Sequence, residues 1–222
     1  MKILYVIQTC DNYFHTRCES STNTWLKKIN SVSDYVFLSA NPVGEKVVGY
    51  RTRDDYFSLP DKWINFITNY DLKKFDWVFA VDDDLFCFPE RLEKFIVENN
   101  FNPNELISIG NKNCFFGELN DDIFCGGAGI LISKTAIQKI KEFVSSTSEP
   151  IKHLCGDCNF HYWFEKLQIP TFNACPGNTT NGNFISVYYK ENHEIVSNLA
   201  QCITLHYCKN EDKYELYKQF YE

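Results

Sequence analysis

Three consecutive aspartates, Asp82, Asp83 and Asp84, directly follow an unbroken apolar run, Trp77–Val81. An uninterrupted apolar segment of this length is typical of a central β-strand that is covered on both faces. Because burying unpaired charge is costly, the aspartates must emerge where that strand ends. Ligand crevices in open α/β sheets lie at the carboxyl ends of the strands, so we expect a functional site at this edge.

The spacing of the aspartates predicts a metal site. Asp82 and Asp84 point to the same side of an extended segment, because side chains alternate with a period of two. Two carboxylates so close together repel each other, and a divalent cation relieves the repulsion. Hard oxygen ligands suit Mn²⁺ or Mg²⁺. The alternative interpretation is a solvated acidic loop that caps the next helix.

Strand-like and helix-like segments alternate along the chain, which predicts an α/β fold with a mostly parallel central sheet flanked by helices. We expect strands at Ile3–Gln8, Asp34–Ser39, Trp77–Val81, Leu106–Gly110, Ala128–Ser133 and Ile203–Tyr207. We expect helices at His15–Ile29, Leu59–Tyr70, Pro89–Val97, Thr135–Val144, Asp157–Leu167 and Asp212–Tyr221. A chain of 222 residues is long enough for one well-cored domain, so we expect a single domain over residues 1–222.

The balance of charge narrows the class of partner. The net charge is -7, whereas binding to a nucleic-acid backbone needs a basic face, so we expect no nucleic-acid partner. A nucleotide stays compatible, since a bound cation bridges acidic side chains to a diphosphate. The apolar run Ile3–Ile7 is too short for a secretory signal or a membrane span. We therefore expect a cytoplasmic protein whose ten cysteines are mostly reduced and buried.

Several segments, in the right order, resemble the fringe-like and related β-1,3 glycosyltransferases. That family has the GT-A fold, and its hallmark is an apolar strand ending in a DDD or DXD motif. Besides the aspartates, the resemblance is carried by Ile3–Thr9 with Arg17 and Thr24-Trp25, by Leu59–Lys62, by Phe124–Ser133, by Gly156-Asp157 and by Thr204–Tyr207. It covers most of the chain, and it implies a single GT-A-like domain.

The resemblance implies an inverting, metal-dependent hexosyltransferase that moves a sugar from a UDP-sugar to the hydroxyl of a glycan or another acceptor. Asp84 would ligate Mn²⁺, or else Mg²⁺, with His206 as a further ligand because a neutral imidazole suits Mn²⁺. Asp82, a second candidate ligand, would together with Asp83 hold the ribose or a metal-bound water.

The same resemblance assigns residues to the donor. Thr9 and Arg17 would face the nucleotide, and Lys62 would contribute to the donor pocket. Gly126 and Gly127 would line the donor or the acceptor sugar, where the backbone must approach a ligand closely. Tight packing explains these two glycines equally well.

Asp157 is the candidate catalytic base. Inverting transfer requires a carboxylate to take the acceptor hydroxyl proton as that oxygen attacks the anomeric carbon. The alternative, which is compatible with this role, is that Asp157 caps the helix that begins near Asn159. Trp163 in the same helix either packs in the core or forms a sugar-stacking wall, and core packing is favoured.

Three other functions compete with sugar transfer. A sugar-binding module of the same fold would have lost turnover. A zinc or redox protein would use the CxxC pair Cys155 and Cys158, completed by His153, His161, Cys202 or Cys208. A nucleotidyltransferase would show a glycine-rich phosphate loop after the first strand, which is absent. A glycosylation sequon at Asn178-Thr-Thr180 has no meaning in a cytosolic protein.

Overall fold

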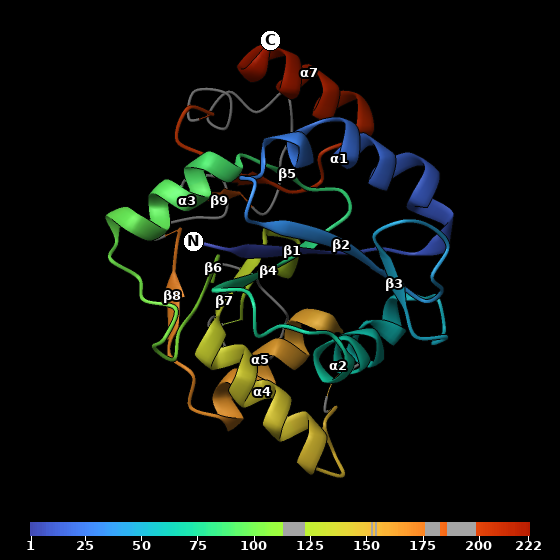
Figure 1. Ribbon diagram of the computed structural model, residues 1–222, viewed down its shortest axis with the longest axis vertical. Coiled ribbons are helices and arrows are strands. Elements are labelled where there is room, and N and C mark those ends of the chain that lie inside the picture. The colour runs from blue at the N-terminus through green and yellow to red at the C-terminus, as the bar shows by residue number, and fades with distance from the viewer. Residues whose placement is uncertain (113–122, 152, 154, 176–182, 186–198) are drawn as a thin grey trace.

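The computed structural model describes residues 1–112, 123–151, 153, 155–175, 183–185 and 199–222. Within these residues a seven-stranded sheet forms the middle layer of the protein, with helices on both faces (Figure 1). In spatial order its strands are β3 (Val47–Gly49), β2 (Asp34–Ser39), β1 (Ile3–Gln8), β4 (Trp77–Asp82), β7 (Ile130–Ser133), β6 (Ser108–Gly110) and β8 (Thr171–Asn173). A smaller sheet has the order β5 (Phe86–Cys87), β10 (Thr204–Leu205), β9 (Phe184–Ile185).

The main sheet is mostly parallel, as expected. Only the pairings of β7 are antiparallel, with β4 on one side and β6 on the other. β4 lies in the middle of the sheet, and its parallel neighbour β1 pairs Gln8 with Asp82. The segments that follow β1 and β4 therefore leave the sheet side by side, and they carry Thr9 and the aspartate run to one place.

Each face of the sheet has its own apolar core. Along β1, Leu4 and Val6 belong to one core, whereas Ile3, Tyr5 and Ile7 belong to the other, and all five are fully buried. The first core packs under α2 (Leu59–Asn69), α4 (Lys134–Ser146) and α5 (Gly156–Lys166). On the other face lie α1 (Glu19–Asn23), α3 (Pro89–Glu98) and α7 (Asn210–Tyr221) (Figure 1). Burial on both faces explains why β1 and β4 are continuous apolar runs.

The expected helix over His15–Ile29 is wrong in detail. The segment forms a π-helical turn at Phe14–Cys18, the short α1, and a 3-10 turn at Trp25–Lys28. Hydroxyl side chains in this segment donate to backbone carbonyls three or four residues earlier; for example, Thr24 Oγ1 lies 2.6 Å from the Ser20 oxygen. Such bonds compete with regular helix geometry and bend the chain.

Other differences concern the ends of elements. β7 begins at Ile130, because Gly126–Ala128 forms a 3-10 turn and Gly129 adopts a left-handed φ of 103°. β10 is shorter than predicted, so His206 follows the strand instead of lying within it. The short strands β3, β5, β8 and β9 were not predicted. The remaining predicted helices form within one or two residues of their expected bounds.

Candidate active site

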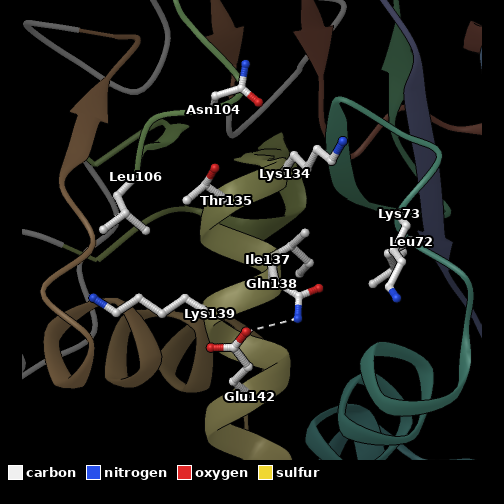
Figure 2. Close-up of a pocket in the computed structure, with 10 residues that line it drawn as sticks. All are labelled: Leu72, Lys73, Asn104, Leu106, Lys134, Thr135, Ile137, Gln138, Lys139 and Glu142. Atoms are coloured by element: carbon white, nitrogen blue, oxygen red, sulfur yellow. Dashed lines mark hydrogen bonds between the residues drawn. The ribbon is translucent and has the colours of Figure 1, made fainter.

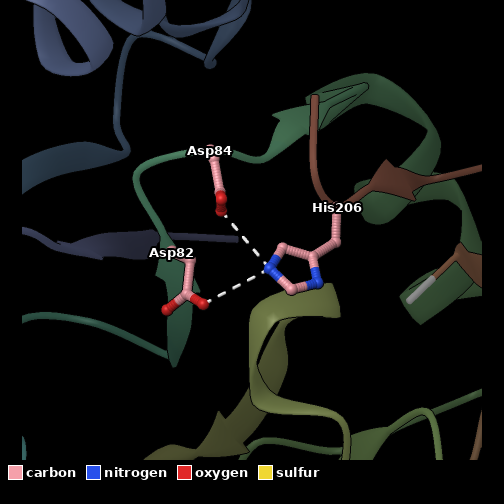
Figure 3. Close-up of side chains that lie close together, drawn as sticks. All are labelled: Asp82, Asp84 and His206. Carbon is pink, nitrogen blue, oxygen red and sulfur yellow. Dashed lines mark ion pairs between the residues drawn. The ribbon is translucent and has the colours of Figure 1, made fainter. Parts of the chain in front are cut away.

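Asp82, Asp84 and His206 converge at the carboxyl end of β4 (Figure 3). Asp82 is the last residue of the strand, Asp84 lies in the turn that follows, and His206 comes directly after β10. His206 Nε2 lies 3.5 Å from Asp82 Oδ2 and 3.3 Å from Asp84 Oδ1. The two carboxylates face the same side, as side-chain alternation predicts. Across the described residues, this is the only group of three histidine, cysteine or acidic side chains close enough to share a metal ion.

The donor atoms of this cluster fit a divalent cation. Two carboxylate oxygens and one imidazole nitrogen, all within 4.8 Å of one another, are a ligand set that Mn²⁺ accepts. Burial acts to lower the pKa of His206, but hydrogen bonds to Asp82 and Asp84 and the charges of both raise it to about 10. The two carboxylates therefore favour positive charge beside His206 Nε2, and metal ligation requires the imidazole in its neutral form.

Asp83 points away from the cluster and anchors the turn. It is 5% exposed and accepts hydrogen bonds from Thr9 Oγ1 at 2.7 Å and from Arg17 Nη1 at 2.9 Å. Arg17 also lies 3.4 Å from Asp84 Oδ2. The predicted donor residues Thr9 and Arg17 are thus gathered at the aspartate run, where both hold Asp83.

Lys62, the residue expected to contribute to the donor pocket, is buried. Its side chain is 1% exposed, and its Nζ donates to the Thr9 carbonyl at 3.1 Å and to Asp54 Oδ1 at 2.8 Å. Asp54 in turn accepts from the backbone N–H of Asp11. Lys62 therefore holds the segment that follows β1, directly at the Thr9 carbonyl and through Asp54 at the Asp11 N–H.

Gln8 links the Asp82 carboxylate to the core, a role that was not predicted from the sequence. Trp63 Nε1 donates to Gln8 Oε1 at 2.8 Å, and Gln8 Nε2 donates to Asp82 Oδ1. These two bonds orient the Asp82 carboxylate. The available signal was a polar residue ending an apolar strand beside the strand that carries Asp82.

Gly126 and Gly127 form a narrow partition between the side chains of Asp157 and His206. A Cβ on Gly126 would lie 2.0 Å from Asp157 Oδ1, and a Cβ on Gly127 would lie 2.1 Å from His206 Cε1. Neither position has room for a side chain. Within the described residues, these glycines therefore approach Asp157 and His206 closely, so the residues on the two sides of the partition are also close to each other.

Asp157 lies in the first turn of α5, whose N-cap is Cys155, so Asp157 is not the capping residue. Its Oδ2 accepts the Gly126 N–H at 3.1 Å. Burial and then the charge of Asp82 raise the pKa of Asp157 to about 7. A carboxylate with a pKa raised towards neutral pH, next to the cluster of Asp82, Asp84 and His206, has the properties of a general base.

The sequence model described as Fringe-like matches residues 1–211. The chain belongs to the Fringe-like family. The match includes all the candidate site residues, from Thr9 to His206.

Solved structures share the GT-A-type fold of this chain. A glycosyltransferase involved in the glycosylation of the major capsid of PBCV-1 aligns with a TM-score of 0.58 and 12% identity, over 99% of this chain and 100% of that one. The apo form of the glycosyltransferase GlyE from Streptococcus pneumoniae TIGR4 aligns at 0.55 and 13% identity, over 97% of this chain and 60% of GlyE. The 4-diphosphocytidyl-2C-methyl-D-erythritol synthase from Anaerococcus prevotii aligns with a TM-score of 0.51 and 10% identity, over 89% of this chain and 96% of the synthase. At sequence identities this low, the structural alignments show a shared fold and nothing more.

The CxxC pair of this Fringe-like chain is a disulfide. Cys155 and Cys158 are bonded to each other, with their Cα atoms 5.5 Å apart, so they do not supply the thiolates that a zinc site requires. Cys18, Cys87 and Cys208 are buried, and burial raises the pKa of each thiol. These three behave as small apolar side chains, as predicted, whereas the CxxC pair does not.

Trp163 packs in the core, as favoured. It is 0% exposed, and its Nε1 donates to the Pro150 carbonyl at 2.7 Å. The sequon at 178–180 lies outside the described residues. In the part of the chain that is described, no helix combines the length and the apolar character needed to cross a membrane.

A separate hollow lies near the other end of the sheet (Figure 2). Leu72 and Lys73 on its wall precede β4, and Lys134 on its wall follows β7, whose Ser133 pairs with the first residue of β4. Its volume is about 460 Å³. This hollow is at the amino end of β4 and is not part of the candidate active site.

Proposed function

We propose that this Fringe-like protein is an inverting glycosyltransferase that uses a divalent metal to move a sugar from a UDP-sugar to an acceptor hydroxyl. One observation carries the proposal: the cluster of Asp82, Asp84 and His206 and the carboxylate of Asp157 lie on either side of the Gly126–Gly127 partition. A donor site and a base are both needed for transfer, and here they are neighbours. Family membership and the glycosyltransferases that share the fold support the same activity.

The donor would bind at the carboxyl end of β4. Asp84, Asp82 and His206 would hold Mn²⁺, with Mg²⁺ as the second choice. When bound, the cation supplies Lewis-acid stabilisation of the departing diphosphate. Arg17, whose side chain is 34% exposed, adds a positive charge beside Asp84 at the same edge. The acidic cluster alone would repel a diphosphate, so donor binding should require the metal.

Asp157 would activate the acceptor. Its carboxylate takes the proton of the acceptor hydroxyl while that oxygen forms a bond to the anomeric carbon of the donor sugar. The bond from the same carbon to the diphosphate oxygen breaks, and its electron pair leaves with UDP. Because the nucleophile enters opposite the leaving group, the anomeric configuration inverts.

The experiment is a screen of UDP-sugars with Mn²⁺, in which released UDP is measured and the anomer of any product is assigned by NMR. The proposal predicts UDP release by the wild type and an inverted product. Asp157→Asn should retain UDP binding and lose at least about a hundredfold in turnover, the usual range for a general base. A protein that binds UDP-sugars but never turns them over would instead be a sugar-binding module. Retention of configuration would exclude the proposed role of Asp157.

A further inference from the structure

A disulfide closes a short loop around the candidate base. Cys155 and Cys158 are bonded, with their Cα atoms 5.5 Å apart, and only Gly156 and Asp157 lie between them. Gly156 opens α5, although glycine loses more conformational freedom on folding than any other residue and is unfavourable in a helix. The crosslink restricts that freedom and therefore helps to fix the backbone that carries the Asp157 carboxylate.

The carboxylate depends on this backbone for its position. Asp157 Oδ2 accepts the Gly126 N–H at 3.1 Å, and Gly126 has no room for a side chain, because a Cβ there would lie 2.0 Å from Asp157 Oδ1. A movement of the first turn of α5 would lengthen this hydrogen bond or close the gap between the two residues. Misplacing a catalytic group by about 1 Å costs on the order of a hundredfold in rate, so the bond between Cys155 and Cys158 is coupled to base function.

Hydrogen bonds hold the two cysteines in place independently of the disulfide. The Cys155 carbonyl accepts from the backbone N–H of Asn159 and from its Nδ2, both at 3.2 Å. Asn159 is 0% exposed, and its Nδ2 also donates to the His153 carbonyl. Cys158 N–H lies on the other side of the loop and donates to Cys155 Sγ at 3.3 Å. Because these contacts keep the two sulfurs near each other, a reduced pair is arranged to form the bond again.

One half of this disulfide is accessible to a thiol in solution. Cys155 is partly exposed, whereas Cys158 is 4% exposed. Thiol–disulfide exchange needs access to one sulfur and a good leaving group on the other. Attack on Cys155 releases Cys158 in the first turn of α5, where the helix dipole favours negative charge. Cys125, which is also disulfide-bonded, is only 3% exposed and is shielded from the same attack.

We propose that Cys155 and Cys158 are a reversible redox site that exchanges with a low-molecular-weight thiol and its disulfide, and that the oxidised form holds Asp157 in position for proton transfer. The effect on turnover rests on the proposed glycosyl transfer, whereas the exchange itself does not. The site is therefore a switch: oxidation fixes the base, and reduction releases it.

The exchange balances with two molecules of thiol, RSH. A thiolate RS⁻ attacks Cys155 Sγ, the bond to Cys158 Sγ breaks, and its electron pair leaves on Cys158 Sγ, which takes a proton. A second RSH attacks the RS sulfur of the mixed disulfide and releases Cys155 as a thiol. Two RSH are thereby oxidised to RSSR while the protein disulfide is reduced to two thiols, and RSSR drives the reverse reaction.

The test equilibrates the full chain in buffers with different ratios of reduced to oxidised glutathione. Alkylation and peptide mass spectrometry measure the reduced fraction of Cys155 and Cys158, hydrogen–deuterium exchange measures protection of the Gly126 amide, and UDP release measures turnover. We expect this pair to be reduced at ratios that leave Cys125 bonded. Reduction should lower protection at Gly126 and lower turnover by roughly ten- to a hundredfold. UDP affinity in Mn²⁺ should change little, because the metal cluster lies outside α5.

Two variants assign the response to this pair. The double variant Cys155→Ser with Cys158→Ala cannot form the bond, so in every buffer it should show the Gly126 exchange and the turnover of the reduced wild type. Cys10→Ser is the matched control, because Cys10 is a partly exposed free thiol. It should keep the full redox response of the wild type. If the double variant does not fold, the titrations of the wild type and of Cys10→Ser still decide.

Equal protection of the Gly126 amide in the oxidised and reduced states would overturn the inference. So would a pair that glutathione does not reduce at any ratio, a response that persists in the double variant, or a response that Cys10→Ser abolishes. Failure of the proposed function is distinguishable from these outcomes. If the wild type releases no UDP from any UDP-sugar, glycosyl transfer is wrong, while alkylation and hydrogen exchange still decide whether the redox site exists and moves the base.

Discussion

The ammonium group of Lys213 lies 2.5 Å from the backbone carbonyl oxygen of Asp83. Lys213 is 0% exposed, and its Nζ also donates to Ser21 Oγ at 2.8 Å and to the Arg17 carbonyl at 3.3 Å. A side chain of the helix α7 thus binds the backbone of Asp83, the middle residue of the aspartate run. Lys213 lies just beyond residues 1–211, which the family model matches.

Replacing Lys213 by methionine should weaken both the fold and the donor site. Loss of the ammonium leaves buried carbonyl and hydroxyl groups unsatisfied, so the free energy of unfolding should fall by about 1–3 kcal/mol. UDP affinity in Mn²⁺ should fall as well, because the turn that carries Asp82 and Asp84 loses its support. Denaturant unfolding and calorimetry measure the two effects. Lys218→Met, at an exposed position on the same helix, is the control. Unchanged UDP affinity in a folded Lys213→Met protein would limit α7 to a structural role.

The glycine partition should separate metal binding from base function. Gly127→Ala should displace the His206 imidazole and weaken Mn²⁺ binding, whereas Gly126→Ala should displace Asp157 and reduce turnover with less effect on Mn²⁺. Titration with Mn²⁺ and a turnover assay on both variants test this. Gly156→Ala is the matched control, because its nearest atom would be 3.6 Å from the new Cβ, an ordinary contact. If Gly127→Ala and Gly156→Ala bind Mn²⁺ equally well, the close approach to His206 is not what shapes the metal site.

The central strands were predictable because their burial on both faces leaves a strong apolar signal. β1 and β2 have the bounds that the sequence predicts, and β4 is longer by the single residue Asp82. Strands of two or three residues, such as β5 and β9, are too short to carry a pattern, and their position depends on tertiary contacts. The break-up of His15–Ile29 depends on hydroxyl-to-carbonyl bonds that leave hydrophobic spacing unchanged.

The part of the candidate site that is formed by neighbouring residues of the sequence was predictable. Asp82 and Asp84 follow from alternation after a buried strand, but nothing in their neighbourhood pointed to His206, whose place was implied by the family resemblance. The burial of Lys213 was not predictable, because the helix that carries it is polar, although Lys213 shares a face with the buried Leu216. The resemblance assigned Lys62 to the donor pocket, and its burial was not predictable because a buried lysine needs partners, here Thr9 and Asp54, that only the fold brings together.

The raised pKa of Asp157 predicts that its contribution to the free energy of unfolding of the metal-free protein falls as pH rises. The folded state holds this proton up to pH about 7, above the ordinary range of an aspartate, so the folded state binds more protons than the unfolded state between those values. Stability from this group is therefore full at low pH and is lost as pH rises through 7. Asp157→Asn removes the titration.

The stability of Asp157→Asn relative to the wild type should accordingly be greater at pH 8 than at pH 5. Denaturant unfolding at the two pH values in the presence of a chelator measures this difference. The exposed Asp71→Asn serves as the control. A relative stability of Asp157→Asn that falls between pH 5 and pH 8 would contradict the assigned direction of the shift.

The most direct test of the central claim is calorimetric titration of UDP into the protein, with and without Mn²⁺, on the wild type, on Asp84→Ala and on the exposed control Asp71→Ala. We expect UDP to bind to the wild type and to Asp71→Ala only when Mn²⁺ is present. Asp84→Ala should lose this binding while remaining folded. UDP binding by Asp84→Ala with wild-type affinity, or no UDP binding by the wild type in saturating Mn²⁺, would contradict a metal-dependent donor site at the end of β4.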